Sequence, residues 1–365
     1  MIQTYSSTIR RKEMEAVLTC MVDEKIGPGE MNAKLLQTVK EYTKCDGAVA
    51  VRSPALALEY AVNALGLEKG SGILLSALAP AWQIQTVERL GYKPLVLDVQ
   101  EDTGLVPAKY VEDGIQKGGR LLILAESMGV LPEIQSYLEL GIPIIEDISQ
   151  SALAYYPEEE GTEQKPREQN PSESQAQEEP KGKRAGMYGT YAIWGMEDHD
   201  VVTAGGGAVI FAANRRDWIV LKKIADEAPS TDIMPDMNAA LAFVEIKEFA
   251  RNESTRRDLF SQFLRSTMSG RHKTYIRAPE YGSTVYSFPL VLNSGFKDVK
   301  AYAQKKGIEV RQAYENSIIA LRQEALSSEC ICANSLLLRC ALFPLYPRLG
   351  QKDAARIVKV LSSLP

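Results

Sequence analysis

The chain has 365 residues, of which 45% are hydrophobic and 24% are charged, an ordinary composition for a soluble globular protein. This length is sufficient for one large domain and a smaller one. The net charge of −5 does not favour nucleic-acid binding, which usually needs a basic face. No apolar run reaches the roughly 18 residues of a membrane span, and the N-terminus lacks the apolar segment of a signal peptide. We therefore expect a cytoplasmic protein without a membrane span.

The cysteines give no sign of a disulfide framework or a metal site. Five of them are scattered along the chain, an odd number that fits reduced thiols. Cys330 and Cys332 are too close together for a usual zinc pair, and no histidine lies near them. We expect no metal site.

The first part of the chain alternates helical patterns with short apolar segments. The spacing of apolar residues predicts helices at 9–24, 30–43, 55–65, 83–90, 107–117 and 133–140. Between and after them are seven candidate strands, at 47–51, 73–75, 95–98, 121–124, 142–146, 190–194 and 208–211. Strands that alternate with helices predict an α/β fold, with a seven-stranded, mostly parallel sheet covered by helices on both faces.

Residues 157–186 interrupt this alternation. They contain eight Glu and five Lys or Arg, but no Val, Ile, Leu, Met or aromatic residue. Such a segment cannot bury enough apolar surface to offset the entropy lost on ordering. We expect a disordered surface loop, with a regulatory or partner-binding segment as the alternative.

The remaining pattern is helical and then mixed. Residues 237–268 predict one long helix or a broken pair, and a final group of elements follows at 274–276, 286–292, 296–306, 308–310, 336–343 and 351–362. We therefore divide the chain into a large α/β domain at 1–235, a connecting long helix at 236–272, and a small α+β domain at 273–365.

The strand at 142–146 ends on two acids, in the sequence Glu146-Asp147-Ile148-Ser149-Gln150. Ligands of open α/β sheets lie at the carboxyl ends of strands, so an acid at this place is a candidate for chemistry. Asp147 is the leading candidate. The alternative is that Asp147 only shapes the following turn, because aspartate commonly forms turns.

Several motifs, in their order and spacing, resemble those of the DegT/DnrJ/EryC1/StrS family of PLP-dependent sugar-nucleotide aminotransferases. The segments that carry this resemblance are Ile26–Gly29, Ala48–Leu58, Leu90–Asp98, Glu146–Ser151, Thr203–Val209 and Ala341–Leu349. The resemblance covers almost the whole chain. It implies the fold of type-I PLP transferases, a PLP or PMP cofactor, a homodimer, a nucleotide-sugar ligand and a link to surface polysaccharide biosynthesis.

Two residues match the family's cofactor contacts, whereas the lysine position does not. Asp147 matches the acid that pairs with the cofactor's ring nitrogen, and Gln150 matches the neighbour of its 3-oxygen. His199 stands where the family has the Schiff-base lysine, counting back from Gly206-Gly207. Histidine cannot form that bond, although it can act as a base near pH 7. It resembles the residue of the family's 3-dehydratase branch; the alternative is a loop residue without a catalytic role.

The phosphate site also departs from the family pattern. The family's Ser-Gly-Thr turn appears as Ser53-Pro54-Ala55, in which proline removes an N–H donor and alanine lacks a hydroxyl. A second phosphate serine falls on Trp194. The stacking aromatic falls near Pro80, and Trp82 is either its replacement or a packing residue. Arg52 is a candidate for phosphate binding, or it pairs with a nearby acid.

The family's partner-subunit asparagine and arginine fall on Thr231 and Ile233.

Losing three or four hydrogen bonds to a charged phosphate, at roughly 1.5–3 kcal/mol each, would weaken cofactor binding by several powers of ten. The main hypothesis is therefore a family member that retains the fold without transaminase activity, with or without a cofactor. The alternatives are an enzyme that binds PLP or PMP non-covalently and uses His199 and Asp147, and a conventional aminotransferase.

Overall fold

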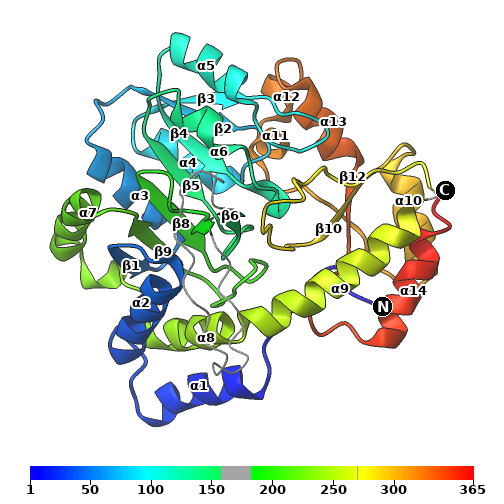
Figure 1. The fold of residues 1–365 in the computed structure, drawn as a ribbon, viewed down its shortest axis with the longest axis horizontal. Coiled ribbons are helices and arrows are strands. Elements are labelled where there is room, and N and C mark those ends of the chain that lie inside the picture. Colours follow the sequence, from blue (N-terminus) through cyan, green and yellow to red (C-terminus); the bar gives the residue numbers. More distant parts are fainter. Residues whose placement is uncertain (158–181, 269) are drawn as a thin grey trace, which may run out of the picture.

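The protein is described by a computed structural model that covers residues 1–157, 182–268 and 270–365 (Figure 1). Most of the segment predicted to be a disordered loop lies outside these residues. Its two ends are described, and they form the antiparallel strands β6 (Tyr155–Pro157) and β7 (Gly182–Arg184). The prediction of disorder was therefore wrong for Pro157 and for Gly182–Arg184.

The main sheet has seven strands in the order β1-β9-β8-β5-β4-β2-β3. The strand β9 is antiparallel to both of its neighbours, and the other pairs are parallel. The seven-stranded, mostly parallel sheet is thus confirmed. The strand bounds are Gly47–Val51 (β1), Gly72–Ser76 (β2), Lys93–Leu97 (β3), Gly119–Ala125 (β4), Ile144–Asp147 (β5), Tyr191–Gly195 (β8) and Ala208–Ala212 (β9).

Helices cover both faces of this sheet, because the strands are apolar on both sides. One face packs against α2, α5, α6 and α8, and the other against α3, α4 and α7. The helix α1 lies outside this layer and contacts α8. The helix bounds are Arg11–Val22 (α1), Glu30–Thr43 (α2), Pro54–Leu65 (α3), Ala81–Arg89 (α4), Ala108–Gln116 (α5), Ile134–Leu138 (α6), Arg215–Glu227 (α7) and Asp236–Lys247 (α8).

The connection to the C-terminal part is a broken pair of helices. α8 ends at Lys247 and α9 (Phe249–Thr267) begins after Glu248, so of the two alternatives the broken pair is present and not the single long helix. In Figure 1, α9 runs diagonally from the main sheet to the C-terminal helix α14 (Gln351–Leu361). The two helices contact each other.

A second sheet of three antiparallel strands, in the order β10-β12-β11, lies in the C-terminal part. It shares a separate hydrophobic core with α9, α14 and α10 (Phe296–Lys305). Its strands are β10 (Phe288–Val291), β11 (Arg311–Gln312) and β12 (Cys340–Phe343). The domain boundaries after 235 and 272 stay predictions.

The prediction for the C-terminal part was wrong at one segment and incomplete at others. The segment 274–276, predicted as strand-like, is not a strand, although Lys273 makes an isolated bridge to Val291. In the segment 308–310, Ile308 makes an isolated bridge to Ile2. The apolar run at 336–343 is the end of a helix, α13 (Ile331–Arg339), followed by β12. Two short helices, α11 (Ile318–Leu321) and α12 (Gln323–Leu326), were not predicted. Within the described ranges, no helix is both long and apolar enough to cross a membrane.

Candidate functional site

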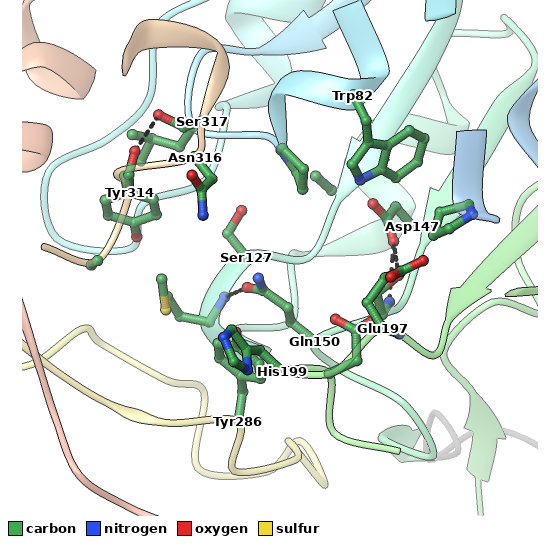
Figure 2. A pocket seen from close by; sticks show the side chains of 18 of the residues that line it. Trp82, Ser127, Asp147, Gln150, Glu197, His199, Tyr286, Tyr314, Asn316 and Ser317 are labelled. Atoms are coloured by element: carbon green, nitrogen blue, oxygen red, sulfur yellow. Dashed lines mark hydrogen bonds between the residues drawn. The ribbon is translucent and has the colours of Figure 1, made fainter. Parts of the chain in front are cut away.

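A cavity of about 240 Å³ lies at the carboxyl ends of β4, β5 and β8. Trp82 and Asp147 line one side of it, and Tyr314, Asn316 and Ser317 lie opposite them (Figure 2). The third side is formed by His199 and Tyr286, and Ser127 and Gln150 lie between these walls. Parallel strands bring their carboxyl ends to one edge of a sheet, which explains why distant parts of the sequence meet here.

Asp147 is the last residue of β5, and its side chain is held by neighbours within the protein. Its Oδ2 accepts a hydrogen bond from Gln83 Nε2 at 2.7 Å. Its Oδ1 accepts from the Ser149 amide at 3.1 Å and from Ser149 Oγ at 2.5 Å. Burial raises the pKa of Asp147, and these hydrogen bonds act in the opposite direction. Asp147 therefore shapes the following turn and also lines the cavity.

Gln150 supports the wall of the cavity. Its Oε1 accepts a hydrogen bond of 2.6 Å from the amide of Met128, a residue with a positive φ of 57°. Arg277 donates to the carbonyl of Met128 at 2.7 Å and to that of Gly129 at 3.1 Å. Such a backbone conformation is unfavourable for a residue other than glycine unless its surroundings hold it. Gln150 and Arg277 supply these contacts.

Trp82 and His199, the candidates for cofactor stacking and for the lysine position, both line the cavity. The His199 ring stacks on Tyr5, with ring centroids 4.1 Å apart and an interplanar angle of 6°. Its Nδ1 lies 3.5 Å from Asp198 Oδ2, and 44% of the side chain is exposed. The catalytic role of His199 and the stacking role of Trp82 stay predictions.

Two of the predicted contact residues lie outside the cavity lining. Ser53 caps α3, because its Oγ accepts from the Leu56 amide at 3.2 Å. Arg52 is exposed at the end of β1, and its neighbour in the lining is Pro54. Trp194, at the position of the family's second phosphate serine, is fully buried in the core, so its indole does not reach the cavity and does not block it.

The lining is strongly acidic, a feature that the sequence prediction missed. It contains no lysine or arginine among the described residues. Arg311 pairs with Glu315 and lies over the Tyr5 ring, but it does not line the cavity. The carboxyl groups of the lining are those of Glu126, Asp147, Glu197, Asp198, Asp200 and Glu315.

Two of these acids have strongly shifted proton affinities. Burial raises the pKa of Asp200 to about 8, and the nearby acids Asp147, Glu197 and Asp198 add to this effect. Burial, followed by the charge of Glu146, raises the pKa of Glu126 well above its usual range. The run Glu197-Asp198-His199-Asp200 was visible in the sequence and could have indicated an acidic wall. Glu126 directly follows β4, so the rule that selected Asp147, an acid at the carboxyl end of a strand, could also have indicated it.

The family's sequence profile matches residues 7–362. This chain belongs to the DegT/DnrJ/EryC1/StrS aminotransferase family. The match covers nearly the whole chain, and every residue of the cavity lining except Tyr5 lies within it.

Solved structures of low sequence identity share the fold. A Streptococcus pneumoniae protein, solved in PLP and PMP forms, has 14% identity; its PLP form has a TM-score of 0.84 and covers 97% of this chain and 96% of its own. DesV from S. venezuelae, in complex with a ketimine intermediate, has 18% identity and a TM-score of 0.82, over 96% and 93% of the two chains. The GDP-4-keto-6-deoxymannose-3-dehydratase ColD, as a histidine-to-asparagine variant with bound GDP-perosamine, has 14% identity and a TM-score of 0.81, over 99% and 100%.

The residues present do not fit the phosphate group of PLP. Burial favours the protonated forms of Glu126 and Asp200, but Glu197, Asp198 and Glu315 also line the cavity, and no lysine or arginine among the described residues does, so a phosphate would meet charges of its own sign. In the first turn of α3, Pro54 has no N–H, and the Leu56 and Ala57 amides donate to Ser53. Few donors thus remain for an anion at this helix N-terminus. Within the described ranges, the structure also has no cluster of His, Cys, Asp or Glu suited to a metal ion.

Proposed function

We propose that this chain is a member of the family that does not transaminate and that acts as a ligand-binding partner or regulator in surface polysaccharide assembly. The observation that carries the proposal is the lining of the cavity beside Asp147, where His199 takes the family's lysine position and no described lysine is present. The link to polysaccharide assembly, the cytoplasmic location and a homodimeric state are proposed from family membership.

The chemistry of the side chains supports this proposal. Transamination needs a primary amine that forms the Schiff base and transfers a proton. An imidazole has no such amine. Lys222 and Lys223 lie on α7, both exposed, and Lys222 pairs with Asp226. Neither lines the cavity, which weighs against a conventional aminotransferase.

The proposal is tested by adding PLP to the purified protein and following aldimine absorbance, with mass spectrometry after borohydride reduction. We expect no stoichiometric adduct and a Kd for PLP in the millimolar range, because several phosphate hydrogen bonds are missing. His199→Lys is the matched variant, and we expect it to remain a poor PLP binder because the acidic lining is unchanged. A stoichiometric aldimine, or micromolar PLP affinity, in the unaltered protein would overturn the proposal.

The second candidate is an enzyme that binds PLP or PMP non-covalently. One observation favours it: His199 lines the cavity together with Asp147. The poor fit to a phosphate group weighs against it. A thermal shift assay with millimolar PMP tests this candidate, since a ligand that binds the folded state raises Tm. A rise in Tm that is lost in His199→Ala would favour the enzyme, and no rise would exclude it.

A further inference from the structure

We infer that the exposed sides of α10 and α14 form a docking surface for a membrane that contains anionic phospholipids. The inference goes beyond the proposed function and does not depend on the cavity. Three observations support it: a local excess of positive charge, the lack of acids that neutralise this charge, and the packing that brings the two helices together.

The first observation is the sign of the charge on the two helices. Residues 296–306 and 351–361 contain seven Lys or Arg and only two Asp, whereas the whole chain has a net charge of −5. A basic region on a protein that is acidic as a whole attracts anionic partners to one place. All seven basic side chains are exposed, and together they are called the basic surface: Lys297, Lys300, Lys305, Lys306, Lys352, Arg356 and Lys359.

The second observation is that these charges are not neutralised within the protein. None of the seven makes an ion pair with any residue that the structure describes. Two of them lie over aromatic rings instead: Lys300 Nζ is 5.8 Å from the ring centroid of Phe296, and Lys306 Nζ is 5.8 Å from that of Tyr302. The positive potential of the basic surface therefore extends into the solvent.

The third observation is the arrangement of the charges on packed helices. Lys352, Arg356 and Lys359 follow the spacing i, i+4, i+7, which places them in one stripe along the exposed side of α14. The opposite side of this helix, with Ala354 and Ile357, is buried in the C-terminal core. The stripe therefore has a fixed orientation and points away from the protein.

Contacts at two places hold α10 beside α14. The hydroxyl groups of Tyr302 on α10 and Ser363, just after α14, share a hydrogen bond of 2.9 Å. Gly307, just after α10, lies against the guanidinium group of Arg356, since a methyl group at Gly307 would be 2.7 Å from Arg356 Nη2. Arg356 thus lies beside the basic end of α10, and the two helices present one continuous basic surface.

Anionic phospholipids fit this surface better than a nucleic acid does. Six of the seven basic residues are lysines. Lysine is a hydrated point charge on a flexible stem, which suits mobile headgroups, whereas arginine is preferred for nucleic-acid recognition. Clusters of about 4–8 Lys or Arg on amphipathic helices are typical of proteins that bind anionic lipids. Because the apolar sides of both helices are buried in the core, we expect binding at the headgroups without insertion.

Co-sedimentation of the purified protein with lipid vesicles tests the inference. Neutral phosphatidylcholine vesicles are compared with vesicles that contain roughly 30% phosphatidylglycerol. At about 0.1 M NaCl, we expect the protein to partition about tenfold or more strongly onto the phosphatidylglycerol vesicles. At about 0.5 M NaCl this preference should be lost, because salt screens charges that are exposed to solvent.

The double variant Lys352→Glu with Lys359→Glu tests the location of the surface. It reverses two charges of the α14 stripe, and we expect partitioning onto phosphatidylglycerol vesicles to fall about tenfold or more. The matched control is Arg216→Glu with Lys223→Glu, which makes the same change in net charge, at the same spacing, on exposed positions of α7. In Figure 1, α7 lies at the opposite end of the molecule from α14, so the control should bind like the unaltered protein. Lys297→Glu with Lys300→Glu gives a second variant if the first does not fold.

Four outcomes would overturn the inference: equal binding to both kinds of vesicle, no binding to the phosphatidylglycerol vesicles, unchanged binding in both lysine variants, or an equal loss in the α7 control. Single-stranded RNA and polyglutamate are added as competitors. If either displaces the protein from the vesicles at a lower concentration of negative charge than the lipid supplies, the partner is a nucleic acid or an acidic protein, and the membrane is excluded.

Discussion

Gln83 of α4 donates a hydrogen bond from Nε2 to Asp147 Oδ2 across 2.7 Å. Ser149 holds the other carboxylate oxygen through its amide and its hydroxyl. Ser149 Oγ in turn accepts from the Gly195 amide at 2.9 Å, which joins the ends of β5 and β8. Asp147 is therefore the centre of an internal polar network, and this network is a structural reason for its presence besides ligand binding.

The variant Gln83→Leu should lower the free energy of unfolding by about 1–3 kcal/mol, because a buried carboxylate oxygen loses its donor. Gln83 itself is fully buried. Urea denaturation measures the change. Gln85→Leu, at an exposed position of the same helix, is the control and should change stability by less than about 0.5 kcal/mol. Equal effects of the two variants would show that the network contributes nothing.

The buried acids Glu126 and Glu146 interact closely, and burial raises the pKa of both. Glu146 accepts backbone hydrogen bonds from Gly186, Tyr188 and Gly189, at 2.9, 2.8 and 2.5 Å. Three N–H donors stabilise a carboxylate, so the negative charge resides on Glu146 and the proton on Glu126.

The two glutamates should therefore respond differently to the same substitution. Glu146→Gln places an NH₂ group against backbone donors and should cost about 2–4 kcal/mol of folding free energy. Glu126→Gln resembles the protonated acid and should change stability by less than about 1 kcal/mol. Denaturant unfolding of both variants at pH 7 measures the difference. A larger loss in Glu126→Gln would mean that the charge resides on Glu126.

The strands of the main sheet were predictable because they are short apolar runs separated by helical patterns. The strand Tyr191–Gly195 is buried throughout, and its nearly continuous apolar sequence is typical of a strand covered on both faces. The C-terminal elements were harder to predict. The apolar run at 336–343 carries no signal that divides a helix from a strand, since Leu336 and Leu337 of α13 are buried like the residues of β12. Tertiary contacts decide the boundary.

The candidate site was predictable only in part. Asp147, Gln150 and His199 follow strands or precede a glycine turn, so family spacing located them in the cavity. The family spacing also assigned Trp194 to a cofactor-contact position. Spacing does not determine the direction of a side chain, however, and the indole of Trp194 points into the core. Residues 314–317 reach the cavity through the packing of the C-terminal part, which no local pattern reveals.

Asp200 should make stability depend on pH. Its pKa is raised to about 8 in the folded protein by burial, with the charges of Asp147, Glu197 and Asp198 adding to the shift. The charge of Asp200 in turn acts on Tyr286. The folded state therefore holds this proton more tightly than the unfolded state. The stabilising contribution is complete below about pH 4 and is lost as the pH rises towards 8.

The variant Asp200→Asn removes this dependence while retaining an acceptor for the Glu197 amide, which donates to Asp200 Oδ2 at 2.8 Å. The side chain is partly exposed, so solvent screens part of the penalty. We expect the variant to be about 2 kcal/mol more stable than the unaltered protein at pH 8 and equally stable near pH 4. Thermal or urea unfolding across this range measures the difference. Asp198→Asn is the control, and a difference that does not vary with pH would contradict the assignment.

The helix α1 presents an apolar face to solvent, which supports the proposed homodimer. Met14, Leu18 and Met21 are 52–54% exposed and lie at helical spacing on one side. Burying such side chains against a second copy would contribute about 1.5–3 kcal/mol each.

We expect the double variant Leu18→Glu with Met21→Glu to weaken dimerisation at least 100-fold, measured by size-exclusion chromatography with light scattering. Thr19→Glu, exposed on the neighbouring side, should remain dimeric. A dimer that persists in the double variant would place the interface elsewhere, and a monomeric unaltered protein would exclude the homodimer.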